Sequence, residues 1–332
     1  MPIGRSRLFA LGAIAIAIVL PLLVRSEYYR QVLVTGYISA IAVYGLNIIL
    51  GYTGLLTLGH AAFFGIGAYA VALLETRLGV PFWVALAAGC AAAVILGYLV
   101  GLVSLRTRGN YFAIFTAAIG VMISIVLTNW QELTGGNIGV LNIPPPAPIG
   151  PISFESSLAK YYLVLVALVF AIVICARVRG SLFGRSLIAI AGNEDLARAV
   201  GIDVMRAKSA AFMLSTFLAG LAGGMYAIFI GFLGPDSSGL DVTFDMLLYL
   251  IVGGVGTLAG PLVGTLVLVI LAQFLSGIDQ YKFLIFGPML VLLIMFFPSG
   301  IVGGIIHLRG MVRRGAPSAP VADAALAQPG AN

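Results

Sequence analysis

Residues 177–208 read RVRGSLFGRSLIAIAGNEDLARAVGIDVMRAK and form a polar-leaning segment inside a chain that is 61% apolar. The segment is 32 residues long and carries six of the 18 lysines and arginines. Long apolar runs lie on both sides of it, so it connects elements that are buried in an apolar medium. A basic connection between apolar runs is typical of the cytoplasmic side of a membrane protein.

One short isolated helix is predicted within this segment, over 194–200. Asn193 can act as its N-cap, and Glu194 and Asp195 suit the positive end of the helix dipole. Gly201 can close the helix at the C′ position. Such a helix spans roughly 10 Å, far too little to cross a bilayer. Three apolar side chains share one of its faces: Leu196, Ala199 and Val200. A small amphipathic helix held in the cytosol predicts a partner that binds it there.

The composition is typical of a membrane protein with many spans. The mean hydropathy is +1.11, 9% of residues are charged, and 42 are glycine. The net charge of +6 does not indicate nucleic-acid binding, because in a membrane protein it mostly reports loops on the cytoplasmic side. The two cysteines, Cys90 and Cys175, lie in apolar runs and provide neither a disulfide framework nor metal-ligand spacing.

Apolar runs of spanning length divide the chain. Seven of them occur at about 8–24, 31–50, 57–75, 82–105, 111–130, 158–176 and 209–232. The next run, 242–275, is 34 residues long, which is too long for one ordinary span and short for two. The glycine-rich sequence GGVGTLAGP, at 253–261, lies in its middle, and a final run covers about 283–298. The first run lacks a small-x-small cleavage site, so we expect an uncleaved span there.

The positive-inside rule distinguishes ten spans from nine. Breaking the 242–275 run at its glycines gives ten spans, with 13 lysines and arginines inside and 5 outside, whereas nine spans give 11 against 7. Ten is favoured, although the break could instead be a re-entrant turn. We therefore expect an all-α polytopic membrane protein with both termini in the cytoplasm. Its single transmembrane domain covers 1–314, and residues 315–332 form a disordered cytoplasmic tail.

The sequence has no catalytic constellation. It contains no Walker A phosphate loop and no zinc-ligand spacing, and its two histidines, His60 and His307, lie far apart. We therefore expect neither enzymatic activity nor a bound cofactor or metal. If transport is energised, the energy must come from another subunit or from an ion gradient.

A candidate pathway lies at 47–69, NIILGYTGLLTLGHAAFFGIGAY, where glycines alternate with polar residues. Unwound backbone at membrane depth is tolerated only beside protein or a water-filled cavity. A second interruption, at 253–261, falls in the other half of the chain, and paired interruptions indicate a translocation path. The alternative is that the glycines only allow close helix packing, and that His60 is only a buried hydrogen-bonding partner. The candidate pathway residues are Asn47, Thr53, Thr57, His60 and Tyr69.

Five segments together resemble one known family. They are GYTGLLTLGHAAFFGIGAY at 51–69, RTRGNYFA at 106–113, FGRSLIAIAGNEDLARAVGID at 183–203, LAGLAGGMY at 218–226 and GGVGTLAGP at 253–261. As a set they resemble the LivM-type permease subunits of branched-chain amino acid ABC importers. The resemblance implies an ABC importer permease fold with an inverted repeat, in the bacterial inner membrane. It also implies the partners: a second related permease, two cytoplasmic ATPase subunits and a periplasmic amino-acid-binding protein.

In such importers a short cytoplasmic helix of each permease docks in a groove of an ATPase. The resemblance places the coupling signature at Glu194, Asp195, Leu196, Ala197, Ala199 and Gly201. The signature begins Glu-Asp-Leu-Ala here instead of the general Glu-Ala-Ala, so it is closer to its own subfamily than to the general motif. Closure of the ATPase dimer would move this helix and reorient the spans around the pathway, which is alternating access.

Two alternative functions stay open at this stage. The same class of permease could carry urea, short amides or other amino acids, because no side chain in the spans recognises a branched aliphatic group. The chain could instead be an ion-coupled secondary transporter, a class that often places charged groups at mid-membrane. Every carboxylate here lies near the end of a span or in a loop, which argues against ion coupling.

Overall fold

The computed structural model describes residues 26–107, 109–146, 156–274 and 300–304, with isolated positions at 17, 19–21, 148 and 154. The described part is helical, apart from an isolated antiparallel bridge between Val140 and Leu233. Its elements are α2 (Glu27–Leu46), η1 (Asn47–Tyr52), α3 (His60–Leu78), α4 (Phe82–Ser104), α5 (Asn110–Asn129), α6 (Gln131–Thr134), η2 (Gly136–Ile138), α7 (Ser157–Gly180), α8 (Leu182–Gly192), α9 (Glu194–Ala199), α10 (Val204–Ile230), η3 (Pro235–Ser238), α11 (Leu240–Gly253) and α12 (Gly260–Phe274).

Six helices in the described residues are long and apolar enough to cross a membrane. They are α2 with its continuation η1, and α3, α4, α5, α7 and α10. Each corresponds to an apolar run predicted from the sequence, from 31–50 to 209–232. The runs predicted at 8–24 and 283–298, and the tail predicted at 315–332, lie outside the described residues. An all-helical membrane protein with many spans is therefore confirmed, and the inverted repeat stays a prediction.

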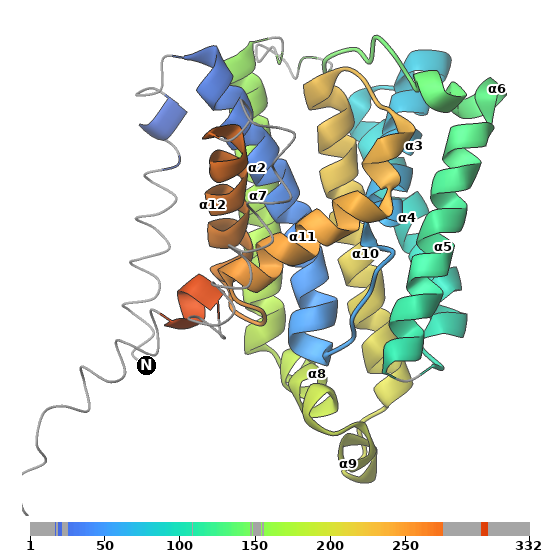
Figure 1. The fold of residues 1–332 in the computed structure, drawn as a ribbon, viewed down its shortest axis with the longest axis vertical. Helices are drawn as coiled ribbons and strands as arrows, with labels where there is room; N and C mark the ends of the chain where they lie inside the picture. The colour runs from blue at the N-terminus through green and yellow to red at the C-terminus, as the bar shows by residue number, and fades with distance from the viewer. Residues whose placement is uncertain are drawn as a thin grey trace, which may run out of the picture.

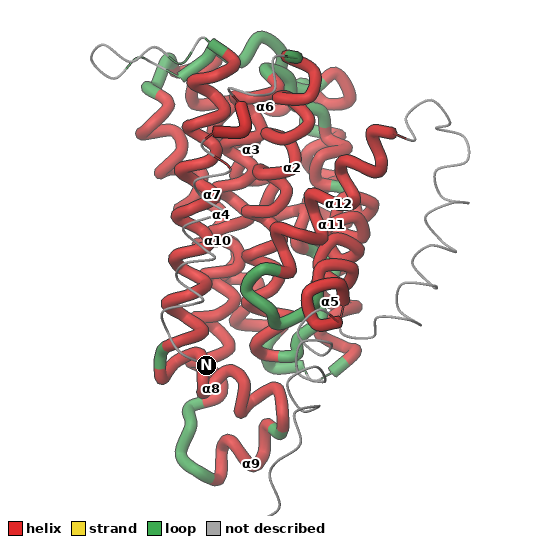
Figure 2. The backbone as a smooth tube through the Cα atoms, turned by 90° about the vertical axis from the view of Figure 1, so that its left-hand side faces the viewer, coloured by secondary structure: helices red, strands yellow, loops and turns green. Residues whose placement is uncertain are grey.

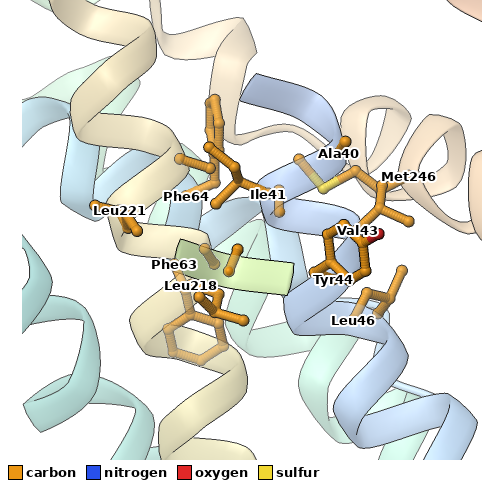
Figure 3. Close-up of a cluster of buried hydrophobic side chains, with 14 of the residues drawn as sticks. Ala40, Ile41, Val43, Tyr44, Leu46, Phe63, Phe64, Leu218, Leu221 and Met246 are labelled. Carbon is orange, nitrogen blue, oxygen red and sulfur yellow. The ribbon is translucent and has the colours of Figure 1, made fainter. Parts of the chain in front are cut away.

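The core of the bundle forms around α2 and α10, which stand between the other spans (Figure 1). Side chains of α2, α3, α10 and α11 meet there, among them Ile41, Phe63, Leu218 and Met246 (Figure 3). By contrast, α4, α5 and α7 turn large apolar side chains outward, as lipid-facing helices do. Neither the central nor the outer helices show a polar face, so the sequence could not indicate which of them lie inside.

Glycines allow α3 and α10 to cross at very short range. A Cβ added at Gly223 of α10 would lie 1.9 Å from the carbonyl O of Phe64. One added at Gly67 of α3 would lie 2.4 Å from the Cα of Gly220. Backbone atoms cannot rotate away as a side chain can, so both positions require glycine. Close packing, the simpler of the two readings of the glycines in 47–69, therefore holds at Gly67.

The long run at 242–275 is broken at the predicted glycines. It forms α11 and α12, which are 14 and 15 residues long. A full span requires about 20 residues, so α11 is too short to be one of the two complete spans assumed in the count of ten, and α12 is described only as far as Phe274. The helices instead form a hairpin: α11 runs obliquely through the bundle, and α12 rises beside α2 (Figure 1). The re-entrant alternative describes this region better.

A second interruption lies between α2 and α3. Residues 54–59 are not helical. The chain leaves the lower end of η1, climbs back into the bundle and only then begins α3 (Figure 1). The first residue of α3, His60, is therefore buried within the bundle, with 1% of its surface exposed. The glycine-rich sequence at 47–69 thus contains an unwound segment, as predicted.

Candidate functional site

The cytoplasmic connection predicted at 177–208 forms a pair of short helices below the bundle. The helices α8 and α9 project from the end of the spans opposite to α6 (Figures 1 and 2). Asn193 joins them directly, because it is both the C-cap of α8 and the N-cap of α9. Its side-chain Oδ1 accepts a hydrogen bond from the backbone N–H of Leu196 at 2.9 Å. The predicted N-cap is confirmed.

The C-terminus of α9 closes as predicted, one residue earlier. Val200 is the C-cap, and Gly201 follows in the left-handed conformation with φ of +87°. The N–H of Gly201 donates to the carbonyl of Arg198 at 3.0 Å, and the N–H of Ile202 donates to that of Ala197 at 3.1 Å. This pair of bonds is a Schellman motif, which ends the helix at its C-terminus as Asn193 begins it at its N-terminus.

The two sides of α9 differ sharply in exposure. Ala197 is buried and packs in a small cluster with Ile190 of α8 and Val204 of α10. Leu196 and Val200 are 64% and 70% exposed. Ala199 is also exposed. The apolar face that the sequence predicted is therefore uncovered, while the opposite side holds α9 against its neighbours. Both α8 and α9 expose large apolar side chains, Leu182 and Ile188 on α8 and Leu196 on α9.

An ion-pair network ties α9 to α10. The Nζ of Lys208 donates to Oε2 of Glu194, and the guanidinium of Arg198 bonds to Oε1 of Glu194 and to Oδ1 of Asp195, each at 3.1 Å. The side chain of Lys208 is only 3% exposed. Glu194, which the sequence predicts as part of a docking signature, therefore stabilises the position of α9 against α10. The sequence analysis missed the partner role of Lys208, which lies 14 residues away from Glu194.

Removing the Glu194 carboxylate is expected to loosen α9. The change Glu194→Ala leaves the buried ammonium of Lys208 without its partner, which costs about 2 kcal/mol for a pair with one partly exposed member. Hydrogen–deuterium exchange of the amides in α9 should therefore accelerate roughly thirtyfold. The double variant Glu194→Gln, Lys208→Met should return exchange toward that of the unchanged protein. An unchanged exchange rate in Glu194→Ala would show that the Glu194–Lys208 ion pair does not stabilise α9.

The two broken-helix regions meet inside the bundle at Asn47. Its Nδ2 donates to the carbonyl O of Thr257 at 3.0 Å, and its Oδ1 accepts from the N–H of Gly256 at 2.8 Å. Asn47 is fully buried and begins η1, a π-helical turn. One turn earlier, the hydroxyl of Tyr44 donates to the carbonyl of Leu258 at 2.9 Å. Interruptions in the two halves of the sequence are therefore in direct contact.

The unwound start of α3 is held by threonines from other helices. The N–H of Leu58 donates to Oγ1 of Thr116 on α5, and the N–H of Ala61 donates to Oγ1 of Thr243 on α11, each at 3.1 Å. The hydroxyl of Thr243 replaces the side-chain N-cap that α3 lacks in its own sequence, and that of Thr116 holds the residue just before it. The sequence analysis missed both threonines, because nothing local to either one indicates a cap for a distant helix.

The other predicted pathway residues lie in different surroundings. His60 is buried, and its Nε2 donates to the carbonyl of Ala42 at 2.9 Å, which fits the alternative of a hydrogen-bonding partner. Thr57 is buried, and Oγ1 of Thr53 donates to a carbonyl within η1. Tyr69 lies apart from them, in the cluster around the bridge of Val140 and Leu233. The five residues therefore do not form one continuous surface.

Comparison with known proteins shows the family. A family model described as branched-chain amino acid transport system, permease component, matches residues 28–298. The high-affinity branched-chain amino acid transport system permease proteins LivM of Salmonella typhimurium and Escherichia coli are each 30% identical to the chain, over 90% of it and 75% of their own length. LivH of Escherichia coli is 25% identical, over 81% of this chain and 92% of its own. No solved structure matches the chain.

The six spans and the broken helices are those of a multi-pass membrane protein. The chain belongs to the branched-chain amino acid transport permease family. It is the permease component of an ABC transport system, a transmembrane subunit that does not carry out catalysis itself. Its similarity to both LivM and LivH proteins indicates a system with paired permeases. The resemblance seen in the sequence is confirmed.

Proposed function

We propose that this permease moves branched-chain, hydrophobic amino acids into the cell by alternating access, driven by ATPase subunits that bind α9. The single observation that carries the coupling is the uncovered apolar face of α9, Leu196 and Val200, beside the charged Arg198 and Asp195. An apolar face with a charged rim is what docking of a helix in a groove requires. The residues proposed to contact the ATPase are Glu194, Asp195, Leu196, Ala197, Ala199 and Gly201, of which Ala197 and Gly201 act by shaping α9.

The proposed complex contains a second permease, two cytoplasmic ATPase subunits and a periplasmic binding protein in the bacterial inner membrane. In it, α8, α9 and both chain termini are cytoplasmic. The charge distribution supports this orientation, because the segment 177–208 concentrates six basic residues at one end of the spans. The similar relatives are named as high-affinity branched-chain amino acid transport permeases, which supports the cargo class. The centre around Asn47, Thr53, Thr57 and His60 is proposed to border the pathway.

Uptake measurements test both the cargo and the coupling. Cells with and without this chain, expressing the rest of the system, are given labelled leucine in competition with valine, alanine, glutamate, amides and urea. We expect chain-dependent leucine uptake that valine displaces and urea does not. Displacement by urea or amides alone would contradict the cargo, and uptake that persists without co-purifying ATPase subunits would indicate a secondary transporter.

The variant Leu196→Asp tests whether the uncovered face of α9 binds the ATPase. It places a charge on the uncovered face of α9 without touching the buried side, so the permease should still insert and pair. We expect about tenfold less ATPase subunit to co-purify, because a carboxylate buried in an apolar groove is costly. Leu182, 75% exposed on α8, provides the matched variant Leu182→Asp outside α9. An equal loss in both would indicate a general surface effect.

A further inference from the structure

The hairpin tip between α11 and α12 is bound to α2 through its backbone. The side chain of Thr257 already closes the tip, since its Oγ1 donates to the carbonyl of Gly254 and accepts from the N–H of Gly260. These bonds leave the backbone N–H of Gly256 and the carbonyl of Thr257 without a partner in the tip, and the side chain of Asn47 forms a hydrogen bond with each. Within the described residues, one buried carboxamide thus joins two interruptions that lie about 210 positions apart in the chain.

The π-helical turn η1 and the hairpin tip also pack too closely for either to shift past the other. A Cβ added at Gly51, one turn beyond Asn47 in η1, would lie 2.7 Å from the N of Gly256. The π-helical turn and the hairpin tip therefore touch backbone to backbone. Isolated π-helical turns inside α-helices are rare and are often found at functional sites. Because a buried polar group requires its partner, the carboxamide of Asn47 should hold this contact as long as both regions stay dry.

The lower end of η1 lies against the cytoplasmic helices. Gly54, which follows η1 in the left-handed conformation, faces α8, and a Cβ there would be in ordinary van der Waals contact with the Cβ of Ala191, at 3.5 Å. Ala191 is the second last residue of α8, and α9 begins three positions later. A movement of α9 therefore displaces the end of α8 and, through Gly54, the π-helical turn.

The hairpin in turn holds the start of α3. Thr243, in the first turn of α11, accepts the hydrogen bond from the N–H of Ala61. A shift of the hairpin therefore changes how α3 begins, beside the unwound residues 54–59. The contacts form an unbroken series: α9, α8, Gly54, Asn47, the hairpin tip, Thr243 and α3.

From this series we infer that Asn47 is a positioning residue that transmits movement of the cytoplasmic helices to the broken helices of the pathway. The inference rests on the proposed function, because it requires an ATPase that moves α9. It assigns to Asn47 a mechanical role, not contact with cargo. A second route exists, from Glu194 through Lys208 to α10. We expect that movement passed to α10 through this ion pair does not by itself reorient the hairpin.

A thiol placed at the hairpin tip reports its movement without any cargo. Val255 is 42% exposed next to Gly256, and the native Cys90 and Cys175 are buried, so Val255→Cys provides one reactive site among the described residues. The complete complex in membranes is labelled with a maleimide, either free of nucleotide or trapped with ATP and vanadate. With Asn47 intact, we expect the labelling rate to change about tenfold between the two states.

Asn47→Leu in this background removes both hydrogen bonds with little change in volume. We expect the labelling rate to become the same in both states, while co-purification of the ATPase stays within about twofold, since α9 is untouched. Tyr44→Phe is the matched control, because it removes one hydrogen bond to the same hairpin and leaves the Asn47 pair. It should retain the nucleotide-dependent change. If Asn47→Leu does not assemble, Asn47→Asp, which keeps one acceptor and loses the donor, is measured instead.

The outcomes separate the inference from the proposed function. If Val255→Cys alone shows no response to nucleotide, ATP-driven movement is absent and the proposed function fails. If it responds, and Asn47→Leu or Asn47→Asp responds equally, the movement travels through α10 and the role of Asn47 is wrong. If both Asn47→Leu and Tyr44→Phe abolish the response, the hairpin contact as a whole transmits movement and the specific assignment to Asn47 is overturned.

Discussion

Gly201→Val is expected to reduce cargo uptake to the level of cells that lack the permease. Gly201 has φ of +87°, and a β-branched residue in that region costs about 1–2 kcal/mol or more. A six-residue helix is too short to be stable by itself, so α9 depends on its two caps and on the small cluster at Ala197. Loss of the C-terminal cap therefore unfolds α9, and with it the exposed face that is proposed to bind the ATPase. Uptake of labelled leucine and ATP hydrolysis by the purified complex are the measurements.

Two other substitutions show whether backbone conformation is the cause. Gly201→Asn should retain most of the uptake, because asparagine tolerates the left-handed region far better than valine. Gly192→Val, at the end of α8, should also be tolerated, since Gly192 has no positive φ and nothing lies within 4 Å of its would-be Cβ. We expect ATP hydrolysis to continue without uptake in Gly201→Val. Full uptake in that variant would contradict a coupling role for α9.

Gly223→Val is expected to prevent the permease from accumulating in the membrane. Even the Cβ would lie 1.9 Å from the carbonyl O of Phe64 and 2.9 Å from the N of Ala68, so α3 and α10 must separate. Overpacking a well-packed interior costs roughly 1–3 kcal/mol, and more where only backbone atoms could yield. This crossing lies in the centre of the bundle, so we expect about tenfold less protein in membranes after clearance of misfolded chains. Immunoblotting of membrane fractions measures it.

A glycine in open surroundings provides the comparison for this effect. Nothing lies within 4 Å of a Cβ built at Gly180, the last residue of α7, and its φ is not positive. Gly180→Val should accumulate normally and melt within about 2 °C of the unchanged protein in detergent. Normal accumulation of Gly223→Val would show that α3 and α10 are farther apart in the membrane than described above.

Local rules explain why α9 could be predicted from the sequence almost to the residue. The N-cap Asn193 and the C′ residue Gly201 act through hydrogen bonds to residues three positions away. The spans could be predicted equally well, because length and hydropathy are properties of single segments. The break at 253–261 followed from its glycines. Its consequence, the hairpin of α11 and α12, depends on packing against α2, which no local pattern encodes.

Pairings over long sequence separations account for what the sequence did not reveal. Asn47 was predicted as a pathway residue, but its partners Gly256 and Thr257 contribute only backbone atoms, which carry no side-chain signal. Lys208 could be counted as a positive-inside charge, yet not as the partner of Glu194. Tyr69 lies in the same glycine-rich stretch as His60, but nine positions along a helix separate them, so they reach different parts of the bundle.

The joint at Asn47 has a consequence for how the protein is made. Its partner N–H belongs to Gly256, which the ribosome reaches 209 residues later. At about 5–20 residues per second, α2 therefore waits on the order of 10–40 s with an amide that has not yet met its native partners. During that interval the nascent helix must shelter the amide in the insertion machinery, in water or against earlier segments. The interval ends when Gly256 and Thr257 are inserted beside Asn47.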